Sequence, residues 1–211
     1  MRAIWKRELK SYFQTVTGWL FIAATLALFG LYFYVYNMYY GSTDISSTLS
    51  AVTFLFLVTV PILTMRTLAE ERKNKTDQLI LTSPVSVEKV VLAKYLATGT
   101  VFTISAAVMC LAPLIMSAYG SVAFVKSYVG VLGFWLYGMT CIAIGTFVSS
   151  LTESIVISAV LTFVFLFVGY LMTGITNLIS QNGNMITKIL GCYDLTKHMD
   201  MLMQGILDVS G

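Results

Sequence analysis

Long apolar runs separated by short polar segments dominate the chain. Five of these runs lie at about residues 19–36, 49–65, 95–118, 128–148 and 155–175, and none of them contains a charged residue. A helix needs about 20 apolar residues to cross the hydrocarbon layer, where no water is available to pair with the backbone. The pattern therefore predicts an all-α, polytopic membrane protein whose residues 1–211 form a single transmembrane domain with five membrane-spanning helices.

Proline and glycine modify this pattern inside the spans. Pro61 and Pro113 fall within the second and third runs, where we expect them to kink the helix. The fourth run contains several glycines, which indicate a close approach of another helix without identifying it. These glycines are Gly130, Gly133, Gly138 and Gly145. The tyrosine-rich residues 31–40 end the first span, and we interpret them as an aromatic belt at headgroup level rather than the wall of a ligand site.

The composition supports a membrane protein and excludes other classes. Apolar residues make up 57% of the chain and charged residues 11%, against about 25% charged residues in soluble domains. The net charge of +3 is small, and the basic residues do not gather on an aromatic-bearing element, so we expect no nucleic-acid partner. Cys110, Cys141 and Cys192 have no paired spacing, and we interpret them as packing residues.

The distribution of basic residues predicts the orientation. Ten of the 13 Lys and Arg residues precede the first span or lie between the second and third. These ten are Arg2, Lys6, Arg7, Lys10, Arg66, Arg72, Lys73, Lys75, Lys89 and Lys94, whereas Lys126, Lys188 and Lys197 lie on the other side. The positive-inside rule then places the N-terminus and loop 66–94 in the cytoplasm and residues 176–211 outside. We expect a multi-pass protein of a cell membrane, such as a bacterial inner or plasma membrane.

The first 17 residues have the pattern of an amphipathic helix. Trp5, Leu9, Tyr12, Phe13 and Val16 fall on one side, and the basic residues fall largely on the other. Such a helix lies in the membrane interface. The alternative is a positively charged anchor with no role beyond orientation.

Loop 66–94 has more internal structure than an orientation signal requires. Residues 70–73 are predicted to continue the second span as a charged helical end. Thr76 then caps a short turn, Asp77 lies near the N-terminus of that turn, and residues 79–81 give it three large apolar side chains. A new helix starts after Ser83–Pro84 or after Ser86, and from it Lys89 and Lys94 are expected to reach toward the interface. This arrangement suits docking into a groove on a soluble partner.

The segment after the fifth span carries the single histidine, His198, between Asp194 and Asp200. Imidazole and carboxylate groups are natural metal ligands. One histidine with two loosely spaced aspartates is a weak signal, so we interpret the cluster as a solvated helix face.

Several motifs together resemble one family. Residues 70–86, EERKNKTDQLILTSPVS, and KYLA at residues 94–97 are similar to the cytoplasmic loop of type-2 ABC transporter permeases, especially the gliding-motility-type subgroup. KRELKSYF at residues 6–13, with the GWLFIAATLALFGLYFY that follows, resembles the opening of the same subgroup, and SSLTES at residues 149–154 resembles its link between the fourth and fifth spans.

This resemblance implies the transmembrane subunit of an ATP-driven exporter working by alternating access. Its partners would be a second copy or a related permease, two cytoplasmic ABC ATPase subunits and the lipid bilayer. The N-terminal segment would be the elbow helix, and residues 75–82 would be the coupling helix. The implied ATPase-coupling residues are Glu70, Glu71, Arg72, Lys73, Thr76, Asp77, Leu79, Ile80, Leu81 and Thr82, and those of the elbow helix are Trp5, Lys6, Arg7, Lys10, Tyr12 and Phe13. Family members usually have six spans, so the sixth is expected to be missing after residue 175.

The residues independently support a division of labour with another protein. The sequence contains no G-x-x-x-x-G-K-[ST] pattern, so we expect no cofactor or ATPase site in this chain, with ATP and magnesium bound by the partner. The absence of charge in the spans argues against a proton-coupled carrier. The alternative function is a non-transporting membrane scaffold that docks a cytoplasmic protein.

Overall fold

The computed structural model describes residues 2–76 and 86–179, with side chains as far as Leu171. Within these ranges every regular element is helical, which confirms the predicted all-α class. The elements are α1 (Arg2–Gln14), α2 (Val16–Phe33), the π-helix η1 (Tyr34–Tyr39), α3 (Ser46–Thr64), α4 (Ala69–Lys73), α6 (Val87–Met109), α7 (Ala112–Ser117), α8 (Phe124–Leu151) and α9 (Ile155–Ile179).

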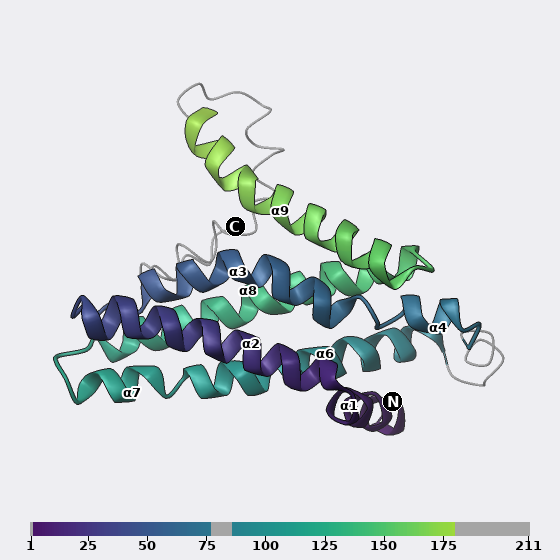
Figure 1. Ribbon diagram of the computed structural model, residues 1–211, viewed down its shortest axis with the longest axis horizontal. Coiled ribbons are helices and arrows are strands. Elements are labelled where there is room, and N and C mark those ends of the chain that lie inside the picture. The colour runs from purple at the N-terminus through teal and green to yellow at the C-terminus, as the bar shows by residue number, and fades with distance from the viewer. Residues whose placement is uncertain (1, 77–85, 180–211) are drawn as a thin grey trace.

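The membrane-spanning part of the described chain is a bundle of long apolar helices. Four segments have the length and apolar composition to cross a membrane, namely Val16–Tyr39, Ser46–Lys73, Val87–Ser117 and Phe124–Leu151, and α9 adds a further apolar helix. In Figure 1, α2, α3, α6 and α8 run side by side, whereas α9 starts near α4 and leans away from the bundle. The protein is therefore a polytopic membrane protein, as the sequence predicts.

The two ends of the bundle differ. Figure 1 shows α4 and the start of α6 at one end and α7 at the opposite end. The N-terminal helix α1 lies at the α4 end and is seen nearly along its axis, so it lies across the direction of the spans. The grey trace of residues 77–85 and residues 180–211 fall outside the described part of the chain. The segment after the fifth span, from which a sixth span is expected to be missing, and the Asp194–His198–Asp200 cluster therefore lie largely or wholly outside the described residues.

Aromatic rings fill the centre of the bundle. Phe56 of α3, Phe102 of α6 and Phe134 of α8 contact one another with ring centroids 5.0 to 5.9 Å apart, and all three are fully buried. Gly138 of α8 faces this cluster, because a Cβ atom there would collide with the ring of Phe102. Gly138 thus makes room for α3 and α6, the neighbours that the sequence did not identify.

The two prolines lie in different settings. Pro61 lies inside α3, which ends three residues later at Thr64. Pro113 was predicted to kink a continuous helix, and this prediction is wrong. The helix α6 ends at Met109, and Pro113 lies in the first turn of the next helix, α7. A helix tolerates proline in its first turn, where the missing N–H would have had no helical acceptor.

A buried amide organises the end of the bundle that carries the tyrosines. Asn37 belongs to η1, and its side chain is buried. Its Nδ2 group donates hydrogen bonds to the carbonyl oxygens of Ser42 (2.8 Å) and Asp44 (3.2 Å). Its Oδ1 atom accepts a hydrogen bond from the Thr48 hydroxyl (2.6 Å). Tyr34 and Tyr40 point outward and are exposed, as an aromatic belt requires. The π-helix and the inward-facing Asn37 were not predicted.

Candidate functional site at the stem of loop 66–94

Residues 65–76, here called the loop stem, connect the second span to the segment that resembles a coupling helix. Residues 70–73 form the predicted charged helical end, but the helix is interrupted, because α3 ends at Thr64 and α4 begins only at Ala69. The backbone amides of Leu68 and Ala69 instead donate to the hydroxyl oxygen of Ser149 in α8, both at 3.1 Å. A side chain from α8 thus provides acceptors for the first amides of α4 and starts this helix separately.

The far end of α4 is closed within the stem itself. Lys75 has φ of 55°, a left-handed conformation that commonly terminates helices. The Thr76 amide and hydroxyl then bond back to the carbonyl oxygen of Glu71, at 2.9 and 3.3 Å. The Thr76 hydroxyl therefore closes α4, and the turn that it was predicted to cap lies outside the described residues.

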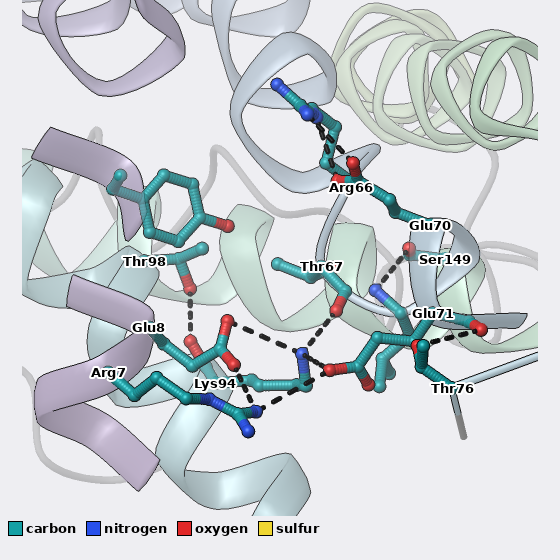
Figure 2. A network of polar contacts seen from close by, with 12 residues as sticks. Arg7, Glu8, Arg66, Thr67, Glu70, Glu71, Thr76, Lys94, Thr98 and Ser149 are labelled. Carbon is teal, nitrogen blue, oxygen red and sulfur yellow. Dashed lines mark hydrogen bonds and ion pairs between the residues drawn. The ribbon is translucent and has the colours of Figure 1, made fainter. Parts of the chain in front are cut away.

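A buried lysine lies against the stem. Lys94 of α6 is only 3% exposed, and its Nζ donates to the carbonyl oxygen of Thr67 at 2.8 Å. The same ammonium pairs with Glu71 at 2.8 Å and with Glu8 of α1 at 3.5 Å, as Figure 2 shows. The expectation that Lys94 reaches to the membrane interface is therefore wrong. Two carboxylates and a carbonyl oxygen surround its ammonium inside the protein instead.

Arg7 lies next to the two carboxylates that pair with Lys94, at the end of the bundle that is predicted to face the cytoplasm. Its side chain is 62% exposed, and its guanidinium pairs with Glu8 at 2.9 Å and lies 3.8 Å from Glu71. Two cations and two carboxylates from α1, α4 and α6 thus alternate in one network (Figure 2). Removing one member of a buried ion pair costs about 3–5 kcal/mol, because its partner is left without compensation.

The N-terminal helix α1 is docked on the bundle through its apolar side. Trp5 Nε1 donates to the Thr100 hydroxyl at 3.3 Å, and the Tyr12 hydroxyl donates to the carbonyl oxygen of Leu63 at 3.4 Å. Burial, followed by the nearby Glu8 carboxylate, raises the pKa of Tyr12 above its ordinary value. Phe13 packs edge-on against Trp19.

The opposite side of α1 is polar. Lys6, Arg7 and Lys10 are all exposed, as the predicted amphipathic pattern requires. Val16 departs from that pattern, because it begins α2 and is 74% exposed.

A cleft of about 580 Å³ opens between α1 and the loop stem. Three cations and three carboxylates line it, together with hydroxyl and amide groups. The charged residues are Arg7, Glu8, Arg66, Glu70, Glu71 and Lys94. Arg66 and Glu70 form a two-armed ion pair at 2.9 and 2.8 Å within the stem itself. The cleft is thus closely balanced in charge. The ion pairs of Lys94 join its two walls, whereas the Arg66–Glu70 pair lies within one wall.

The predicted coupling residues divide into two groups. Glu70 and Glu71 turn into the cleft and are engaged by Arg66 and Lys94, whereas Arg72, Lys73 and Thr76 are exposed at the end of α4. The structure does not describe the rest, which are Asp77, Leu79, Ile80, Leu81 and Thr82. It places the start of α6 at Val87, directly after Ser86, the second of the two predicted starting points.

Sequence reasoning missed four residues of this site: Glu8, Thr67, Lys94 and Ser149. Glu8 is the single acidic residue among the basic residues of the N-terminal segment, and this isolation was a usable signal. Lys94 is the last charged residue before the third span. A charged side chain at that position can either form an ion pair inside the protein or face the solvent. Ser149 lies in the SSLTES segment, but nothing in that segment alone reveals its partners in the loop stem.

The comparisons with known proteins give a family and no individual relative. No curated protein and no solved structure matches the chain. Residues 32–204 match the family described as ABC-2 family transporter protein, and this range includes the spans from the end of α2 onward and the whole loop stem. Because the match covers most of the chain, the protein belongs to the ABC-2 family of transporter proteins.

Proposed function

We propose that this chain is the permease subunit of an exporter and that loop 66–94 couples it to a cytoplasmic ATPase. The family match supports a permease subunit of an ABC transporter, because such subunits lack an ATPase site and associate with a separate ATPase subunit. On this proposal the partner binds ATP and magnesium, and a second permease subunit completes the transport pathway. The nearer assignment to the gliding-motility-type subgroup stays a resemblance of the quoted motifs.

The observation that carries the proposal is the attachment of the loop stem to three other helices. Lys94 joins the stem to α6, Glu8 joins that lysine to α1, and Ser149 joins the stem to α8. A loop that merely connects two spans has no need of buried polar contacts to elements far away in the chain. With these contacts, a displacement imposed on residues 77–85 is passed to the ends of several spans.

Two further features favour the cytoplasmic side for this site. The loop and α1 carry ten of the 13 basic residues, and short basic loops stay on the cytoplasmic side. Arg72 and Lys73 are exposed at the end of α4, and in the sequence they come shortly before residues 75–82, which resemble the coupling helix. On this proposal the mechanism is alternating access. Closure of the ATPases moves the loop, and the loop moves the spans around a central pathway.

The test is to replace Leu79 and Ile80 together with Asp and to purify the tagged chain from its native membrane. We expect the amount of ATPase that copurifies to fall about tenfold, as it does when apolar anchors of an interface are removed. ATP turnover per permease should fall with it. The matched control is Thr43→Asp, an exposed position at the opposite end of the bundle, which should leave both quantities unchanged.

Unchanged ATPase association in the double variant would overturn the coupling proposal. If the wild-type chain binds an ATPase stably but the reconstituted complex shows no ATP turnover, the scaffold function is favoured instead.

A further inference from the structure

We propose that Lys94 is a positioning residue that holds the elbow helix α1 and the loop stem together, so that both move as one unit when the loop is displaced. This inference rests on the proposed coupling function. It adds a specific residue, outside loop segment 75–82, through which the loop would act on the N-terminal helix.

The contacts of Lys94 show that it joins segments far apart in the chain. Its ammonium lies in α6, one carboxylate partner comes from α4 and the other from α1. The ammonium also donates a hydrogen bond to the Thr67 carbonyl oxygen in the break between α3 and α4. Lys94 therefore contacts α1, α4 and the break before α4 with one charged group.

Burial makes this junction rigid. The Lys94 side chain is 3% exposed, and those of Glu8 and Glu71 are 16% and 19% exposed. Water is therefore a poor substitute for any of the three groups, and separating them would leave charges in a poorly solvated site. Exposed ion pairs, in contrast, contribute about 0–1 kcal/mol and exchange easily with water.

The two hydrogen bonds that anchor α1 elsewhere on the bundle do not have their acceptors in the stem. Trp5 binds Thr100 of α6, and Tyr12 binds Leu63 near the end of α3. Among the described residues, the polar links from α1 to α4 are the Glu8–Lys94–Glu71 chain and the longer contact of Arg7 with Glu71. Without Lys94, two carboxylates would face each other with the exposed Arg7 between them, and we expect the stem to separate from α1.

The test measures the separation of α1 and α4 directly. Spin labels at Lys10→Cys and Lys73→Cys, both exposed positions, are placed in the full chain, in its complex in lipid nanodiscs, with Cys110, Cys141 and Cys192 replaced by Ala. We expect one narrow distance distribution in the otherwise unchanged chain, with and without a non-hydrolysable ATP analogue. Lys94→Met and Glu71→Gln should each broaden it or add a longer distance.

A second ion pair in the same cleft provides the control. Arg66 and Glu70 are four residues apart within one segment, and their side chains are 33% and 36% exposed. Arg66→Gln therefore removes a comparable charge without cutting a link between elements, and its distance distribution should match that of the unchanged chain. Narrow distributions in both Lys94→Met and Glu71→Gln would overturn the inference.

If Lys94→Met does not fold, the Glu71→Gln result decides the question alone. The distances are also recorded without nucleotide and without ATPase. If the coupling proposal is wrong, no ATPase copurifies with the chain. If the present inference is wrong, the distances in Lys94→Met and Glu71→Gln are the same as in the otherwise unchanged chain.

Discussion

At the scale of single residues, packing between the spans depends on positions where a side chain would not fit. A Cβ atom on Gly145 of α8 would collide with the Thr64 hydroxyl and lie 2.8 Å from its Cβ atom. Thr64 is fully buried at the end of α3, so it has no free space to move into. The contact of α8 with the last turn before the loop stem therefore requires glycine.

We expect Gly145→Ala to destabilise the folded protein by about 1–3 kcal/mol, the usual cost of overpacking a filled core. The matched control is Gly30→Ala in α2, where an added Cβ atom meets nothing within 4 Å. Thermal unfolding in detergent compares the two variants. Equal unfolding temperatures for both would contradict the close contact of α3 and α8.

A second residue, Asp44, makes stability depend on pH. Its carboxylate accepts bonds from the Lys126 ammonium (2.6 Å), the Ser46 amide (3.0 Å) and the Ser46 hydroxyl (2.7 Å). Burial raises the pKa of Asp44, but the bonds from Lys126 and Ser46 outweigh burial and hold the pKa below its ordinary value. The folded protein therefore favours the charged carboxylate more than the unfolded chain does.

Asp44→Asn should lower the free energy of unfolding by up to about 1 kcal/mol at neutral pH, because the side chains of the Asp44–Lys126 ion pair are nearly half exposed. Because the pKa of Asp44 is lower in the folded protein than in the unfolded chain, its contribution to stability is fully present above the unfolded pKa of about 3.9. It is lost as the pH falls through the folded pKa. Denaturant unfolding from pH 7 to pH 3 should show the two proteins converging at the acidic end. A difference that grows on acidification would refute the assignment.

At the scale of elements, α4 is a short helix whose start depends on a side chain of another helix. Five residues are too few to form a stable helix alone. The Ser149 hydroxyl accepts both the Leu68 and Ala69 amides and donates to the Met65 carbonyl oxygen at 3.4 Å. The orientation of α4, and with it the direction in which the loop leaves the bundle, is therefore set by α8.

Ser149→Ala leaves two amides without their acceptor, and each unsatisfied buried group costs about 1–3 kcal/mol. We expect faster hydrogen exchange of the peptide that contains residues 65–73, measured by mass spectrometry. Ser150→Ala is the control, because the Ser150 hydroxyl donates to the carbonyl oxygen of Phe147 in its own helix. Equal exchange in the two variants would show that Ser149 does not hold the start of α4.

At the scale of the whole molecule, the arrangement brings α1 and the loop stem to one end of the bundle and Asp44 and Lys126 to the other. The basic residues of the first end predict that it faces the cytoplasm. We expect a membrane-impermeant thiol reagent to label Thr43→Cys in intact cells and Lys73→Cys only after permeabilisation. The reverse pattern would overturn the orientation.

The elements were predictable where one local pattern decides the outcome. The apolar runs predicted the spans, and the spacing of Trp5, Tyr12 and Phe13 predicted the apolar side of α1, because burial of one face follows from helical periodicity. The polar site was not predictable in this way. The break before α4 depends on Ser149, 81 residues away from Leu68, and the burial of Lys94 depends on carboxylates from two other segments.

The shared lysine has a consequence for how the sequence can diverge. A descendant that lost the positive charge at position 94 would retain acidic groups at positions 8 and 71 that repel each other. Neutral residues at all three positions would again be compatible, whereas single exchanges would be selected against. Among natural homologues, the identities at positions 8, 71 and 94 should therefore change in concert.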